Sequence, residues 1–161
     1  IEQVTADHIG RIQMKHFTAA ITLGTLLLTP AFAQAQDMVS YSTDLDYADV
    51  TFGLESAITD RGFVVDHISH VGEMLERTRA DVGSDVVLFQ QADVYSFCSA
   101  KLSRQVVEAE PMNITFCPYD IFVAQRPGED TVTIGFRSFP KGDMQIIQSL
   151  LDEIAREAIE E

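Results

Sequence analysis

Cys98 and Cys117 are the only two cysteines among the 161 residues, and they are the side chains best suited to chemistry. In an oxidising compartment the first interpretation of such a pair is a disulfide. That bond would close a loop of about twenty residues and add roughly 3 kcal/mol of stability in a chain-entropy estimate. It requires that the two α-carbons come within about 7 Å of each other. Thiols that pack as small buried hydrophobic groups are a second interpretation.

The neighbours of the two cysteines suggest a more reactive role. Cys98 precedes Ser99, a predicted N-cap, so the free N–H groups and the dipole of the helix would lower the pKa of the thiol. Cys117 precedes Pro118 on a predicted bent strand. Two such sulfur atoms can act as a redox pair or contribute to a site for a soft metal or haem. The chain has no C-x-x-C or C-x-x-C-H motif, so no spacing favours either use.

His67 and His70 are the two histidines that remain after the amino-terminal apolar segment. They fall in a predicted strand, where positions an odd number apart point to opposite faces, so the pair is a poor metal clamp. The simplest interpretation of each is a strand histidine whose ring is hydrogen-bonded. One of them could still reach Cys98 or Cys117 across a sheet and form a thiolate–imidazole pair.

Composition and motifs exclude several functional classes. The formal net charge is −14, with 25 acidic and 11 basic residues. This balance argues against a nucleic acid or an anionic membrane as the main partner, because both are bound by basic surfaces. The acidic pairs lack the spacing of a calcium loop, and we interpret them as solvated surface. Phosphate-binding loops, dinucleotide fingerprints, nucleophile elbows and zinc-protease motifs are also absent from the sequence, which favours a protein that is not an enzyme.

The amino-terminal region has the pattern of a secretory signal peptide. A weakly basic start at residues 14–16 is followed by an uncharged apolar run, residues 17–28, which is too short to cross a bilayer. Two small-x-small cleavage sites end at Ala33 and Ala35. The mature protein would then be periplasmic or secreted and free of the membrane. The predicted divisions are an upstream extension that is not part of the native protein (1–13), a signal peptide (14–35) and a single domain (36–161).

Hydrophobic periodicity and turn residues divide the rest of the chain into strands and helices. Predicted strands cover residues 38–43, 63–71, 86–89, 94–98, 114–125 with an interruption at Pro118, and 131–137. Predicted helices cover residues 49–61, 72–82 and 100–109, and a last helix opens at Asp143. Mostly antiparallel strands backed by helices on one face make an α+β fold.

Four segments of the chain resemble one protein family, the domain of unknown function 302, over residues 44–161. Two of them look like those of exported proteobacterial members, although many members have the order Pro-Cys where this chain has Cys117-Pro118. The resemblance implies a TATA-binding-protein-like α+β fold with β-α-β(4)-α topology, in which an antiparallel sheet is packed by helices. The four segments are Arg61-Gly62-Phe63, Phe97-Cys98-Ser99-Ala100-Lys101-Leu102, Val107-Glu108-Ala109-Glu110-Pro111 and Phe116-Cys117-Pro118-Tyr119.

The family has no established activity, so we state the function as alternatives. The first is an exported domain that has no cofactor and binds a small ligand or a partner protein. The second is a periplasmic thiol redox protein, or one that handles a metal or haem, and the third is a structural module that forms a homodimer. The candidate ligand or redox residues are Cys98, Ser99, Cys117, Pro118, Tyr119, His67 and His70, with Cys98 and Cys117 as the candidate disulfide.

Overall fold

A computed structural model describes residues 38–160 of the chain. The predicted upstream extension and signal peptide lie outside the described residues. Within residues 38–160, none of the helices combines the length and the apolar character that crossing a membrane requires.

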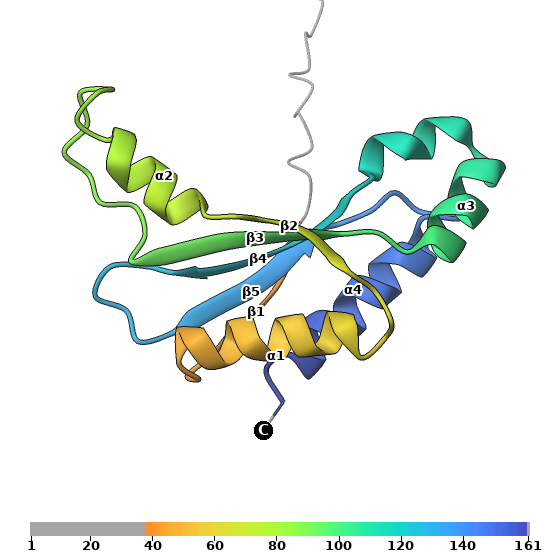
Figure 1. The fold of residues 1–161 in the computed structure, drawn as a ribbon, viewed down its shortest axis with the longest axis horizontal. Coiled ribbons are helices and arrows are strands. Elements are labelled where there is room, and N and C mark those ends of the chain that lie inside the picture. Colours follow the sequence, from red (N-terminus) through yellow and green to blue (C-terminus); the bar gives the residue numbers. More distant parts are fainter. Residues whose placement is uncertain (1–37, 161) are drawn as a thin grey trace, which may run out of the picture. The chain divides into compact units, whose positions relative to one another are not determined.

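The described part of the chain forms one antiparallel sheet with helices in the connections (Figure 1). The strands are β1 (Met38–Thr43), β2 (Val65–Ser69), β3 (Gln91–Phe97), β4 (Tyr119–Gln125) and β5 (Val132–Arg137). The helices are α1 (Tyr47–Thr59), α2 (Val71–Thr78), α3 (Ala100–Ala109), the short 3-10 helix η1 (Pro111–Phe116) and α4 (Gln145–Glu157).

The strand order across the sheet is β1-β5-β4-β3-β2, and every neighbouring pair is antiparallel. Along the chain, the strands together with α1 and α4 follow the expected β-α-β(4)-α order. Helix α2 is inserted between β2 and β3, and α3 with η1 is inserted between β3 and β4. The predicted α+β fold class is therefore confirmed.

The hydrophobic core lies between one face of the sheet and the helices α1 and α4, which contact each other. Every second residue of β3, β4 and β5 points into this core, as expected for strands with one buried face. The helices contribute side chains at the three- and four-residue spacing of one helix face. Core members with almost no exposed surface include Phe97, Tyr119, Ile121, Ile134, Phe136, Leu54, Ile58, Ile147, Leu151 and Ile154.

Two predicted extended segments differ from the structure. Residues 86–89 form an irregular loop, and Val86 and Leu88 in it are exposed. Strand β4, the neighbour of β3, ends at Gln125, which pairs with Gln91, so the residues before Gln90 have no strand beside them to continue the ladder. The apolar run therefore lacks the partner that a strand needs.

The segment before Pro118 is the second difference. It forms η1 and not a strand, because Pro111 occupies the first turn and the Glu110 carboxylate accepts a hydrogen bond from the Met112 N–H at 3.1 Å. Strand β4 begins only at Tyr119, directly after the Cys117-Pro118 peptide, which is cis.

Gly135 lies in β5 between two neighbouring strands and has no room for a side chain. A β-carbon at this position would lie 2.5 Å from the carbonyl oxygen of Val39, 2.9 Å from the Ser40 β-carbon and 3.0 Å from a ring carbon of Phe122. The Phe122 ring and strand β1 thus occupy the space that any other residue would need.

We expect Gly135→Ala to lower the free energy of unfolding by about 1–3 kcal/mol, because the added methyl group must displace backbone on one side and an aromatic ring on the other. Urea denaturation measures the loss. Thr133→Ala, two residues earlier on the same strand and face, is the matched control and should cost less than about 1 kcal/mol. Equal losses in the two variants would contradict the close packing of β5 at Gly135.

Candidate functional site

The two cysteines lie together where β3 ends and β4 begins. Cys98 follows β3 and Cys117 precedes Pro118, and the pairing of Phe97 with Tyr119 makes these segments neighbours. The side chain of Cys117 lies close enough to Cys98 to raise the pKa of its thiol, and both are free thiols that are partly buried. The structure therefore brings together the two sulfur atoms that the sequence singled out.

A short polar network extends from the two thiols. The Cys117 thiol donates to the Ser103 Oγ at 3.6 Å, and the Ser103 Oγ lies 2.9 Å from the hydroxyl oxygen of Tyr119. Burial is the main reason why the pKa of Tyr119 is raised, so its hydroxyl stays protonated and available as a donor. We call Cys98, Cys117, Ser103 and Tyr119 the thiol cluster.

The expectation of a lowered Cys98 pKa is wrong. Burial, followed by the neighbouring Cys117, raises the pKa of Cys98 to about 11. The predicted N-cap itself is confirmed, since Ser99 is buried and accepts a hydrogen bond from the Leu102 N–H at 3.4 Å. Cys98 lies one residue before this cap, and the loss of contact with water outweighs any effect of the helix on its thiol.

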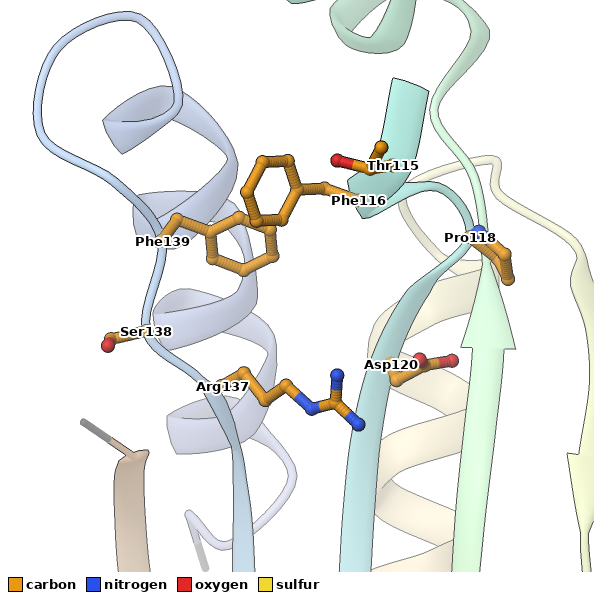
Figure 2. A pocket seen from close by; sticks show the side chains of 7 residues that line it. All are labelled: Thr115, Phe116, Pro118, Asp120, Arg137, Ser138 and Phe139. Carbon is orange, nitrogen blue, oxygen red and sulfur yellow. The ribbon is translucent and has the colours of Figure 1, made fainter. Parts of the chain in front are cut away.

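Pro118 lies at the edge of a cleft beside the thiol cluster. Strands β4 and β5 are paired from Phe122 opposite Gly135 to Gln125 opposite Val132. Beyond Phe122 and Gly135, toward the start of β4 and the end of β5, their pairing stops. A cavity of about 270 Å³ occupies this end of the two strands (Figure 2). It is lined by Thr115, Phe116, Pro118, Asp120, Arg137, Ser138 and Phe139.

Aromatic side chains form one wall of the cleft. The rings of Phe116 and Phe139 have their centroids 5.7 Å apart, and the centroid of Tyr119 lies 6.2 Å from that of Phe139. Helix α4 fixes the backbone of Phe139, because Gln148 accepts from its N–H at 2.8 Å and Gln145 donates to its carbonyl at 3.0 Å. Tyr119 belongs to both the thiol cluster and this aromatic group, so the two are one continuous structure.

Side chains of opposite charge line the cleft from β4 and β5. Asp120 and Arg137 would be direct partners if the ladder from Phe122 and Gly135 continued by two residues. In Figure 2 the Arg137 guanidinium extends toward β4, but the Asp120 carboxylate points away from it, and the two form no ion pair in the described part of the chain. The Asp120 carboxylate instead accepts a hydrogen bond from the Ser96 hydroxyl at 2.6 Å. Both charges therefore remain available to a ligand.

The sequence interpretation missed Asp120 and Arg137. Apolar and polar residues alternate in both strands, and each of the two charged residues occupies a polar position next to the point where its strand begins or ends. This pattern could have identified them. That the two residues line the same cleft depends on the register between β4 and β5, and the alternation of apolar and polar residues does not determine this register.

The two histidines lie apart from the thiol cluster. His67 is an exposed residue of β2, at a register shift opposite Ser96. The assumption that one strand contains both histidines is wrong, because β2 ends at Ser69 and His70 is the N-cap residue of α2. Its Nδ1 lies 2.8 Å from the Asp93 carboxylate. Neither imidazole hydrogen-bonds to a thiol among residues 38–160.

Metal-ligating side chains do not gather in this part of the chain. Among residues 38–160, no three side chains of His, Cys, Asp or Glu lie close enough together to hold one metal ion. The thiol cluster therefore offers two sulfur atoms, a serine and a tyrosine, which is the donor set of a dithiol pair with hydrogen-bonding neighbours.

We expect Cys98 to ionise near pH 11 in the reduced protein, and Cys117→Ser to lower that midpoint, because Cys117 is one cause of the raised pKa. The pH dependence of alkylation by iodoacetamide, read by mass spectrometry on the peptide that contains Cys98, measures both midpoints. Ser103→Ala, which removes a contact of Cys117 and one of Tyr119 but none of Cys98, is the control. A wild-type midpoint below pH 9 would contradict the burial of this thiol.

Known proteins resemble this chain in sequence pattern and in fold. The crystal structure of an uncharacterized conserved protein DUF302 from Bacillus stearothermophilus is similar to this chain with a TM-score of 0.54 and 19% sequence identity, over 77% of this chain and 94% of that one. No curated protein matches the chain. The family model described as Domain of unknown function DUF302 matches residues 39–161, which agrees with the family suggested by the sequence motifs. The chain belongs to the DUF302 family.

Proposed function

We propose that this DUF302 domain is exported and binds a small zwitterionic molecule of the amino-acid type in the cleft between β4 and β5. The observation that carries the proposal is the position of Asp120 and Arg137, which both line the cleft without forming an ion pair in the described part of the chain. Two opposite charges left open in this way match a ligand that carries both charges itself.

Each group of the cleft has a defined task in such a complex. The planar guanidinium of Arg137 can hold a carboxylate through two parallel hydrogen bonds. Asp120, fixed by Ser96, can accept hydrogen bonds from an ammonium group. The Phe116 and Phe139 rings offer an apolar surface for the side chain of the ligand. A volume of about 270 Å³ lies near the lower end of ligand pockets and suits one small molecule.

Export is supported by the sequence pattern of residues 14–35, which has a basic start, a short apolar run and small residues at two cleavage sites. The net charge of −14 suits a small protein that must stay soluble after export. A binding domain in this compartment would meet free amino acids and related small molecules directly.

L-phenylalanine is the probe that tests the proposed ligand class. Isothermal titration calorimetry should detect its binding to the full chain. Two analogues each lack one charge: 3-phenylpropionate has no ammonium group, and 2-phenylethylamine has no carboxylate. Each should bind at least tenfold more weakly than L-phenylalanine. The reason is that each lost charge removes a charge-assisted hydrogen bond of about 1.5–3 kcal/mol. Arg137→Gln and Asp120→Asn should weaken L-phenylalanine to the same degree.

Arg104→Gln is the matched control for the loss of one positive charge, because Arg104 lies exposed on α3, where it pairs with Glu108 at 2.7 Å. This variant should bind like the wild-type protein. If L-phenylalanine does not bind, or if Arg104→Gln weakens it as much as Arg137→Gln does, the proposal fails.

A second candidate function is favoured by the contact between Cys98 and Cys117. In an oxidising compartment we propose that the two thiols pass two electrons and two protons to the disulfide of a thiol–disulfide oxidoreductase. A bond then forms between Cys98 and Cys117, and the oxidoreductase is left with two thiols. The new bond would connect the end of β3 to the start of β4, beside Pro118 at the edge of the cleft.

Protein isolated from the exported fraction and alkylated before lysis tests this step. Its intact mass should show no alkylated cysteine and should lack the residues through Ala33 or Ala35. Cys98→Ser and Cys117→Ser should lower the stability of the oxidised protein equally, by roughly 3 kcal/mol, because either substitution removes the same bond. Two alkylated thiols in the exported protein, or unequal losses, would exclude the disulfide.

A further inference from the structure

A second cavity lies at the other end of β3, away from the cleft. It occupies about 540 Å³ between α2 and the segment that leads into β3. Its polar lining consists of Glu73 and Glu76 from α2 and Gln90 and Gln91 on the opposite side, where Val87 and Phe89 add apolar surface. His70 and Asp93 belong to its lining as well. The proposed function in the cleft uses none of these side chains.

Three side chains from three different elements form a hydrogen-bonded chain at this cavity. The Nδ1 of His70, at the start of α2, lies 2.8 Å from one oxygen of the Asp93 carboxylate in β3. The other carboxylate oxygen accepts from the hydroxyl of Tyr47, the first residue of α1, at 2.9 Å. Tyr47 is buried in the core, while the His70 side chain keeps 58% of its surface exposed. The chain thus leads from the core to the cavity.

This arrangement fixes the orientation and the tautomer of His70. A carboxylate accepts hydrogen bonds, so the neutral imidazole holds its proton on Nδ1 and leaves the lone pair of Nε2 free. Nε2 has no hydrogen-bond partner among residues 38–160. An imidazole that is oriented by a carboxylate and has one open nitrogen is the usual form of a general base.

The backbone keeps the imidazole in place. A β-carbon on Gly72 would lie only 2.7 Å from the backbone nitrogen of Ala92, so the first turn of α2 lies directly against β3. His70 and Asp93 each lie one or two residues from this contact. The distance between the two side chains is therefore set by packing between two elements and not by a mobile loop.

We propose that His70, positioned by Asp93 and Tyr47, is a general base that activates water against small uncharged esters bound in the cavity beside α2. In this step a water molecule gives a proton to Nε2, and its oxygen forms a bond with the acyl carbon. The bond between the acyl carbon and the alcohol oxygen breaks, and the proton on Nε2 passes to that oxygen. The products are a carboxylic acid and an alcohol, and His70 is neutral again.

The charges around the cavity select against anionic substrates. Glu73 faces His70 from the first turn of α2, and Glu76 is paired with Arg79 at 3.0 Å. Asp93 and Tyr47 face the imidazole from β3 and α1. Arg77 of α2 lines the adjoining cavity, together with His67 and His70. Asp93 first, and Glu73 to a smaller degree, raise the pKa of His70. Hydrolysis should therefore increase with pH as the imidazole loses its proton.

Hydrolysis of p-nitrophenyl acetate by the full chain tests the proposal. We expect His70→Gln to lower the rate above that of buffer at least tenfold, because general-base catalysis contributes about 10²–10⁴-fold. His67→Gln is the matched control, because His67 is also an exposed histidine and lines the adjoining cavity, but no carboxylate orients it in the described chain. This control should stay within twofold of the wild-type protein.

Asp93→Asn and Tyr47→Phe test the two positioning residues. Asp93→Asn should move the midpoint of the pH–rate profile to lower pH, because it removes the anion that holds the proton on His70. Tyr47→Phe keeps both His70 and Asp93. It should shift the midpoint of the pH–rate profile by less than half as much as Asp93→Asn does. Equal rates in His70→Gln and wild type would overturn the proposal, and an unchanged midpoint in Asp93→Asn would overturn the role of Asp93.

Discussion

The end of pairing between β4 and β5 is the constraint on which the candidate site depends. The two strands share a ladder as far as Phe122 and Gly135, and two residues further on Asp120 and Arg137 line a cavity instead of pairing. Gly135 allows the Phe122 ring to lie against β5 at this last paired position. Beyond it, the aromatic rings of Phe116 and Phe139 take the place of strand pairing. Backbone geometry and side-chain packing thus produce an opening between β4 and β5 at this end of the sheet.

Tyr119 connects this opening to the thiols. Its ring packs edge-on against Phe97 and Phe139, and its hydroxyl lies next to Ser103, which in turn contacts Cys117. The residue is buried and belongs to the core, so the β3–β4 junction and the aromatic wall of the cleft pack against the same side chain. A change in the bonding of the two sulfur atoms would therefore act on the same structural unit that forms the wall of the cleft.

The sequence predicted the features that depend on local pattern and missed those that depend on register. The strand at residues 38–43, the N-cap Ser99 and the α+β class all follow from periodicity and capping. The juxtaposition of Asp120 and Arg137 depends on how β4 is aligned with β5, and that of His70 and Asp93 on where β2 ends. The pKa of Cys98 was predicted in the wrong direction because burial is a tertiary property.

The order of the strands in the sheet affects how the chain folds. Strand β1 lies at one edge of the sheet, and its only strand neighbour in the described residues is β5, with Met38 opposite Arg137. Its Tyr41 also hydrogen-bonds to Asp152 of α4. Contacts between segments so distant along the chain slow folding, because a large loop must close before they form. Strand β1 therefore stays without its partners until β5 and α4 have been synthesised.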